Sequence, residues 1–234
     1  MSKAAESYWK LLNDLEDFVR HGERVARDAP QGLGFTRRGS AAVRGDTTED
    51  RRRRLEAIAE RVARCERCPL CRDRMKTVPG AGALDPKVMV IGEGPGAEED
   101  RRGEPFVGRA GQYLDRWLDA IGIKRETNAF IGNIVKCRPP GNRDPKPDES
   151  DACIGYLKEQ IEIIRPATIL AVGRIASGIL IGSTGGIGSL RGKTYSYQGI
   201  PLVPTYHPAA VLRNPELRKP VWDDLQRLET LFPK

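Results

Sequence analysis

Residues 87–100 read KVMVIGEGPGAEED, an apolar run followed by a turn with three glycines and four carboxylates. A short apolar run that ends at a glycine-rich turn is typical of a buried strand in an α/β protein, whose chemistry gathers at the carboxyl ends of the strands. The turn does not suit a phosphate, because its spacing differs from G-x-G-x-x-G, Pro95 lacks an N–H donor and the carboxylates repel anions. We therefore expect this turn to present an acid, Glu93, at the end of a strand.

Apolar runs and segments of helical periodicity alternate along the rest of the chain. The apolar runs predict strands over 87–91, 129–135, 168–172 and 202–206. The periodic segments predict helices over 110–121, 148–164, 174–181 and 216–231. Strands separated by helices favour an α/β fold with a parallel central sheet and helices on both faces, a three-layer α/β/α arrangement. Glycine and serine in 182–192 predict an exposed loop.

The N-terminal part of the chain has a different composition. Apolar residues at helical spacing over 5–28 predict an amphipathic helix, and the mixture of Gly, Ser, Thr, Asp and Arg over 29–50 predicts a flexible basic linker. Four consecutive arginines then lead into a second predicted helix over 55–64. We therefore divide the chain into an appended N-terminal helix with its linker (1–50) and an α/β domain (51–234).

The composition limits where and with what the protein acts. The chain has 234 residues, 39% of them apolar, which is enough for one sizeable core. Neither an apolar run near 18 residues nor a signal-peptide pattern is found, so we predict no membrane span and expect a cytoplasmic monomer. The formal net charge of +7 favours a polyanionic partner such as nucleic acid.

Five cysteines in a chain predicted to be cytoplasmic favour metal or redox chemistry over disulfides. Cys65, Cys68 and Cys71 form C-x2-C-x2-C, and Cys137 and Cys153 follow as distant single residues. The segment around the first three, CERCPLC, is too charged for a core strand. Four thiolates at such spacing suit an iron–sulfur cube as well as zinc, and one cysteine is left over.

A histidine is predicted at the same edge of the sheet as Glu93. His207 directly follows the apolar run 200–206, and Asn133 lies in the strand predicted over 129–135. The only other histidine, His21, falls in the predicted N-terminal helix, where we expect it on the surface. An acid, an amide and an imidazole at one sheet edge indicate a binding or catalytic pocket.

Four motifs and the cysteine spacing together carry a resemblance to a known family. The motifs are GEGPGAEED at 92–100, PFVGRAG at 105–111, NIVKCRPPGNRDP at 133–145 and HPAAVLR at 207–213. With them, residues 65–232 resemble the family 4 uracil-DNA glycosylases, the iron–sulfur branch of the uracil-DNA glycosylase superfamily. The combination is far more specific than any single motif.

The resemblance assigns roles to particular residues. It implies a [4Fe–4S] cluster held by Cys65, Cys68, Cys137 and Cys153, with Cys71 as the extra thiol. It implies that the catalytic residues are Glu93 and His207. It implies uracil contacts from Gly94, Glu99, Phe106, Asn133 and Asn142. It implies DNA contacts from Val211, Leu212 and Arg213. Most relatives carry Ser after the His-Pro pair where this chain has Ala209, so we expect no side-chain hydrogen bond to DNA from that position.

The chemistry of these side chains agrees with the resemblance. An enzyme acting on a base in duplex DNA extrudes it, and Phe106 would stack on the extruded uracil while Asn133 reads its O4 and N3–H. A donor from His207 near O2 and a water handled by Glu93 would break the glycosidic bond. The expected function is a monofunctional uracil-DNA glycosylase of DNA repair, which releases uracil and leaves an abasic site.

Other functions stay open at this point. One is a non-catalytic or covalently trapping uracil-DNA-binding protein, although the covalent branch carries a histidine after the second strand and residues 136–147 contain none. Another is a polymerase-associated iron–sulfur module, docked on a replication or repair protein through the N-terminal helix. A dinucleotide oxidoreductase is disfavoured by the acidic turn.

Overall fold

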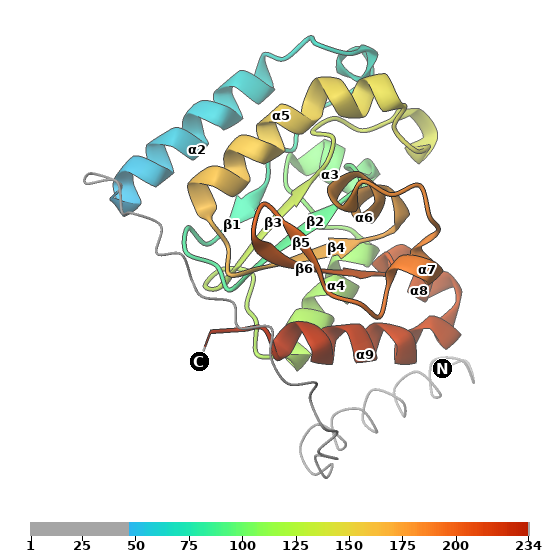
Figure 1. The fold of residues 1–234 in the computed structure, drawn as a ribbon. Coiled ribbons are helices and arrows are strands. Elements are labelled where there is room, and N and C mark those ends of the chain that lie inside the picture. Colours follow the sequence, from blue (N-terminus) through green and yellow to red (C-terminus); the bar gives the residue numbers. More distant parts are fainter. Residues whose placement is uncertain (1–46, 234) are drawn as a thin grey trace, which may run out of the picture. The chain divides into compact units, whose positions relative to one another are not determined.

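A computed structural model describes residues 47–233, which form a six-stranded sheet with helices on both faces (Figure 1). The helix predicted over 5–28 lies outside the described residues, as does most of the linker predicted over 29–50. The domain boundary at residue 50 therefore stays a prediction.

Four parallel strands form the centre of the sheet, in the order β3, β2, β4, β6. They are β2 (Val88–Gly92), β3 (Ala129–Asn133), β4 (Thr168–Val172) and β6 (Ile200–Thr205). A short antiparallel strand lies at each edge, β1 (Ala81–Gly82) beside β3 and β5 (Tyr195–Tyr197) beside β6. The predicted α/β fold with a parallel centre is confirmed, whereas the two edge strands were not predicted.

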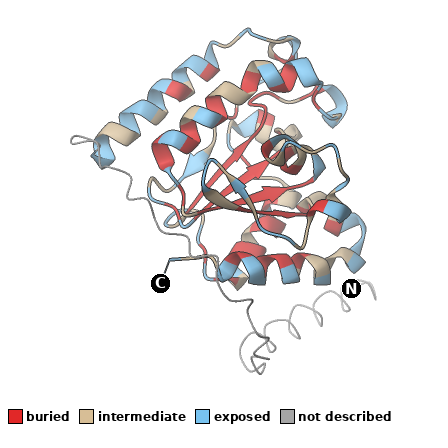
Figure 2. Ribbon diagram, viewed as in Figure 1, coloured by how far each residue is buried: buried red, intermediate tan, exposed pale blue. Residues whose placement is uncertain are grey.

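Helices cover both faces of this sheet. On one face lie α2 (Thr48–Ala63), α5 (Pro147–Ile164) and α6 (Arg174–Ile181). On the other face lie α4 (Arg109–Ala120) and α9 (Arg218–Glu229) (Figure 1). Successive strand residues point to opposite faces, and helices cover both faces, so the four central strands are mainly apolar along their length. They are buried between the helix layers (Figure 2), apart from the first two residues of β6.

The start of α2 has a local cause in the sequence. The Thr47 side chain accepts the backbone N–H of Asp50 at 3.1 Å, and the Asp50 carboxylate accepts the backbone N–H of Thr47 at 3.2 Å. This reciprocal cap satisfies two N–H groups that the first turn of a helix leaves unpaired. The helix therefore begins at Thr48, earlier than the predicted start at residue 55.

Several short elements were not predicted. They are the α-helices α3 (Ala97–Arg102), α7 (Ile187–Leu190) and α8 (Pro208–Arg213), and three 3-10 turns over Pro69–Cys71, Pro140–Asn142 and Pro215–Leu217. Helix α7 falls within the loop predicted over 182–192, where Leu190 is buried. The prediction of an exposed loop is therefore wrong for Ile187–Leu190, which form a helix, and for Leu190, which is buried.

The central strands all end at the same edge of the sheet. Gly92 pairs with Asn133 across β2 and β3, and Val172 pairs with Thr205 across β4 and β6. Segments that follow these strands consequently meet above one edge, as the sequence predicted for Glu93 and His207. No helix within residues 47–233 is long and apolar enough to cross a membrane.

Candidate active site

A pocket of about 430 Å³ lies at the carboxyl edge of the central strands. It is lined by eight of the residues for which the sequence predicted a role. These are Glu93, Gly94, Glu99, Phe106, Asn133, Asn142, His207 and Arg213. The structure thus brings together residues from four segments that are far apart in the chain.

Asn133 ends β3 and presents an unpaired acceptor. Its side chain is 1% exposed, and its Oδ1 atom has no hydrogen-bond partner among the described residues. Leaving a buried polar atom unpaired costs about 1–3 kcal/mol, so such an atom in a pocket wall is a candidate for contact with a ligand. A Cβ atom on Gly92 would lie 2.5 Å from this oxygen and 2.6 Å from the Phe106 ring, so only glycine fits beside them.

Phe106 supplies an aromatic surface to the pocket. Its ring is 6% exposed, and its centroid lies 5.7 Å from that of the His207 ring at an interplanar angle of 31°. The backbone φ of Phe106 is +53°, in the left-handed region that residues with a Cβ rarely adopt. The ring is therefore placed by an unusual backbone conformation rather than by an ordinary loop.

Glu99, predicted to contact uracil, holds two walls of the pocket together. Its Oε1 atom accepts the backbone N–H groups of Val107 and Gly108, both at 2.9 Å, and its Oε2 atom accepts that of Gly96 at 3.1 Å. These bonds connect the turn after β2 to the segment before α4. The structure therefore gives Glu99 a role in shaping the pocket that the sequence did not reveal.

His207 precedes α8 and accepts a hydrogen bond from its first turn. The backbone N–H of Ala209 donates to Nδ1 at 3.1 Å. Burial lowers the pKa of His207 to about 4, aided by Arg213 and opposed by Glu99. At neutral pH the ring is therefore uncharged and carries its proton on Nε2, which makes that atom a hydrogen-bond donor.

Glu93 follows β2 directly and has a perturbed carboxyl group. Burial raises its pKa to about 7, with a further contribution from the negative charge of Asp144 and an opposing one from Arg174. Asp144 and Arg174 form an ion pair with each other beside the pocket. A carboxyl group that exchanges its proton near neutral pH is suited to acid–base work.

The loop before α5 adds pocket residues that the sequence left without a role. Arg143 and Asp144 line the pocket beside Asn142. Arg143 makes two hydrogen bonds of 2.7 Å to the carboxylate of Glu149, which is buried in the first turn of α5. Arg143 and Asp144 both lie in the motif quoted from 133–145. Their position in that motif was the signal in the sequence that could have indicated them as pocket residues.

Two predicted contacts need revision at the level of their side chains. Asn142 is exposed on the turn before α5, and its Oδ1 atom accepts a hydrogen bond of 2.7 Å from Nε of Arg138. Val211 is 1% exposed and packs inward from α8, so its side chain faces the interior instead of DNA. Leu212 is 37% exposed, which leaves it and Arg213 as the outward-facing members of the predicted trio.

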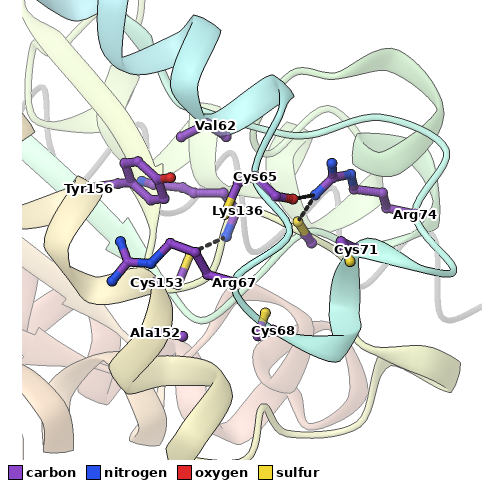
Figure 3. A pocket seen from close by; sticks show the side chains of 11 residues that line it. Val62, Cys65, Arg67, Cys68, Cys71, Arg74, Lys136, Ala152, Cys153 and Tyr156 are labelled. Carbon is purple, nitrogen blue, oxygen red and sulfur yellow. Dashed lines mark hydrogen bonds between the residues drawn. The ribbon is translucent and has the colours of Figure 1, made fainter.

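All five cysteines line one small cavity away from this pocket (Figure 3). Cys65 follows α2, Cys68 precedes the first 3-10 turn and Cys71 ends it, Cys137 follows β3, and Cys153 lies in α5. None of them forms a disulfide. The structure thus brings together the four predicted ligands and also the cysteine that the spacing left over.

Two N–H groups donate to sulfur atoms in this cavity. Nη1 of Arg74 lies 3.2 Å from Sγ of Cys137. The backbone nitrogen of Lys136 lies 3.3 Å from Sγ of Cys153, and both of these residues are labelled in Figure 3. Such donors stabilise thiolates that bind metal. Among residues 47–233, no three His, Cys, Asp or Glu side chains converge on one point suited to a single ion. The five thiols line one small cavity without forming such a group.

The cysteine cavity and the pocket share one stretch of chain. Cys137 and Cys153 flank the segment that contributes Pro139, Asn142 and Asp144 to the pocket wall. That segment is held to α5 by the Arg143–Glu149 pair. Two residues of the cysteine cavity therefore lie at the two ends of one pocket wall.

Comparison with known proteins places the chain in a family. The family model described as "Uracil DNA glycosylase superfamily" matches residues 79–226, which include the whole central sheet and the pocket. Fold and site together therefore define a protein of the class that handles uracil in DNA.

Relatives within that class narrow the assignment. The type-4 uracil-DNA glycosylase of Thermotoga maritima is 44% identical over 184 residues, covering 77% of this chain and 95% of its own. The type-4 uracil-DNA glycosylase of Saccharolobus solfataricus is 45% identical over 184 residues, covering 75% of this chain and 85% of its own. A DNA polymerase of Bacillus phage SP01 is 31% identical over 67% of this chain but only 17% of its own length. The chain belongs to the type-4 uracil-DNA glycosylase family.

Proposed function

We propose that this protein excises uracil from DNA by hydrolysing the N-glycosidic bond, which releases free uracil and leaves an abasic site. The observation that carries the proposal is the buried, unpaired Oδ1 of Asn133 in a pocket that also holds the Phe106 ring and the uncharged His207. Family membership and the type-4 relatives support the same activity.

Asn133 is proposed to read the flipped base. Its Oδ1 accepts the N3–H of uracil and its Nδ2 donates to O4, which satisfies the orphaned oxygen. Cytosine presents an acceptor at N3 and a donor at N4, so the same carboxamide would face two mismatched groups. A site built for one hydrogen-bond pattern rejects a base with the reversed pattern. Phe106 stacks on the base face and orients it.

His207 and Glu93 are proposed to carry the chemistry. Cleavage of the N1–C1′ bond leaves negative charge on uracil, and the Nε2–H of His207 donates to O2 as that charge develops. In its ionised form, which gains its proton with a pKa of about 7, Glu93 orients or deprotonates the attacking water and stabilises the positive character of the sugar. As the oxygen of the water bonds to C1′, a proton of the water passes to the Glu93 carboxylate.

The DNA contacts are proposed to come from α8. Leu212 is apolar and exposed at the end of the helix, where it can fill the space left by the flipped base. Arg213 lines the rim of the pocket and contacts phosphate. Val211 holds α8 against the interior and supports both residues.

The cysteine cavity is proposed to hold a [4Fe–4S] cluster through Cys65, Cys68, Cys137 and Cys153. The shared cavity, the N–H donors to sulfur and the absence of disulfides support this assignment over an ordinary buried core. When bound, the cluster supplies a structural cross-link between α2, the segment after β3, and α5. It takes no part in breaking the glycosidic bond.

One assay tests the proposed activity. An oligonucleotide with a single uracil is incubated with excess protein, and alkali-labile abasic sites are scored over time. We expect His207→Ala to lower the single-turnover rate by about 10²–10³-fold, the range for loss of one oxyanion donor. Binding should change little, because Phe106 and Asn133 still hold the base.

The control for this assay is Lys219→Ala, which removes an exposed ion pair with Asp223 and should cut at the parental rate. A parental protein that binds uracil DNA without releasing uracil would favour the non-catalytic alternative. A protein left covalently attached to the oligonucleotide would favour the trapping alternative.

A further inference from the structure

The backbone at Phe106 is held in a conformation that its own side chain disfavours. A φ of +53° brings the Cβ atom of an L-residue close to its neighbouring backbone, so such residues persist only where surrounding contacts determine them. Within residues 47–233 only four non-glycine residues have positive φ, and Phe106 is the one whose ring lines the pocket. Some contact must therefore hold this peptide in place.

Arg125 makes that contact. Its Nη1 atom donates to the carbonyl oxygen of Pro105 at 2.7 Å, and its Nη2 atom donates to that of Phe106 at 2.8 Å. A planar guanidinium is one of few groups that can reach two successive carbonyls at once. Arg125 follows α4 and lies outside the pocket, so it touches the backbone of Phe106 without contacting the base site.

Asp115 orients Arg125 from the middle of α4. Its Oδ1 atom accepts hydrogen bonds from Nε of Arg125 at 3.0 Å and from Nη2 at 2.7 Å. The Arg125 side chain remains 22% exposed and that of Asp115 43%. Ion pairs with this exposure contribute little to the stability of the fold. The geometry of the pair is specific even though its energetic value to the fold is small.

Gly111 in α4 also contacts the backbone of Phe106. A Cβ atom on Gly111 would lie 1.8 Å from the carbonyl oxygen of Phe106, so this carbonyl rests directly on the backbone of α4. Glu99 accepts the N–H of Val107, which belongs to the same peptide group as the Phe106 carbonyl. The Phe106 carbonyl is thus fixed by α4 and Arg125, and the next N–H is fixed by Glu99.

We propose that Arg125, oriented by Asp115, is a positioning residue for the base-stacking ring of Phe106. It holds the backbone of Phe106 in the left-handed conformation that turns the ring toward the pocket and His207. This inference rests on the proposed uracil-excising function, in which Phe106 stacks on the flipped base.

The test begins with Arg125→Gln, measured by single-turnover release of uracil with enzyme in excess. Misplacement of a substrate-positioning group by about 1 Å costs up to about 10²-fold, so we expect a fall of roughly 10- to 10²-fold. The melting temperature should fall by no more than about 4 °C, as for a partly exposed ion pair. The matched control is Lys124→Gln, which breaks the neighbouring exposed pair with Asp119 and should leave rate and stability unchanged.

A double-mutant cycle with Phe106→Leu separates positioning from a general structural effect. If Arg125 acts through the Phe106 ring, Arg125→Gln lowers the rate strongly in the parental protein and by less than about 2-fold in the Phe106→Leu background. Equal losses in both backgrounds would overturn the proposal. If the melting temperature fell by much more than about 4 °C and the rate losses were additive, Arg125 would instead be a residue that stabilises the fold.

Gly111→Ala provides an independent route to the same element. Alanine favours a helix over glycine, so the substitution should not weaken α4 itself, yet its methyl group displaces the Phe106 carbonyl. We expect a rate loss that is again suppressed by Phe106→Leu. An active Gly111→Ala protein with the parental rate would count against the proposal. A parental protein and Lys124→Gln control that both release no uracil would instead overturn the proposed function.

Discussion

The Nδ1 atom of His207 lies 3.1 Å from the backbone nitrogen of Ala209 and accepts its hydrogen. The donor is a main-chain group, so the missing hydroxyl at position 209 does not affect it. The bond fixes the ring proton on Nε2, the atom left free to face a ligand. A backbone contact thus determines which nitrogen of His207, the proposed catalytic histidine, can donate.

The rate of uracil release should rise with pH and then level off. Glu93 acts as a base only when ionised, and its pKa of about 7 means that its active form declines about tenfold for each pH unit below that value. His207, with a pKa of about 4, stays neutral across the same range and adds no falling limb between about pH 5 and 8. Single-turnover rates measured over this range test the prediction, and a rate that falls as pH rises through 6 to 7 would contradict it.

Replacement of Glu93, the proposed general base, should remove this dependence of the rate on pH. We expect Glu93→Gln to lower the plateau rate by about 10²–10⁴-fold and to flatten the profile, while equilibrium binding to uracil DNA changes little. Binding is measured at a fixed salt concentration because phosphate contacts depend on salt. Parallel losses of binding and rate would assign Glu93 to substrate binding instead.

Asn133→Asp should weaken recognition of uracil. A carboxylate can accept from N4–H2 of cytosine but cannot donate to O4 of uracil, so uracil release should fall by roughly 10- to 10²-fold and discrimination against cytosine should narrow. The matched comparison is Asn142→Asp, on the exposed turn where Oδ1 accepts a hydrogen bond from Arg138. This variant should lose less of the rate of uracil release than Asn133→Asp does. Unchanged uracil kinetics in Asn133→Asp would remove Asn133 from the reading role.

Substitutions in the cysteine cavity should separate ligands from the extra thiol. We expect purified protein to contain about four iron and four sulfide per chain, and Cys137→Ser and Cys153→Ser to lose iron and brown colour together with stability. Cys71→Ala should keep its iron. Zinc without iron in anaerobically purified protein would exclude the cluster, and loss of iron in Cys71→Ala but not in Cys68→Ala would show that the ligand set is different.

A buried carboxylate in α9 should be important for stability. Asp224 is fully buried and accepts hydrogen bonds from Arg191, Thr205 and Gly192. Asp224→Ala leaves the Arg191 guanidinium without this partner, so we expect a loss of about 3–5 kcal/mol in unfolding free energy. Asp223→Ala, beside it but exposed and paired with Lys219, should change stability by less than about 1 kcal/mol. Thermal unfolding of both variants compares them directly, and equal effects would contradict the prediction.

The sheet could be predicted from sequence because its central strands are mainly apolar runs. β2 and β4 are bounded by glycine and charged residues and are buried on both faces, so their signal does not depend on a partner. β1 and β5 are held by pairing with β3 and β6, and so short a segment carries no periodicity of its own. The reciprocal Thr47–Asp50 cap was readable, since threonine followed three residues later by an acid is a start signal for a helix.

The residues that line the pocket could largely be predicted from the sequence. The contacts and orientations of their side chains could not. Family motifs identified Glu93, Asn133 and His207, and strand ends explained why they meet. No pattern in the sequence indicates that Glu99 binds backbone N–H groups on both sides of the pocket. Similarly, the inward turn of Val211 depends on how α8 packs, which a six-residue helix does not reveal through periodicity.

One pocket wall lies between Cys137 and Cys153, which both line the proposed cluster site. A chain that has not acquired iron would lack the proposed cross-link at both ends of this wall, and contacts such as the Arg143–Glu149 pair would have to hold it alone. The capacity of a cell to correct deaminated cytosine with this protein would then follow its iron supply. Starvation for iron, or oxidative loss of it, would appear as an increase in C-to-T mutations without any change in the amount of protein made.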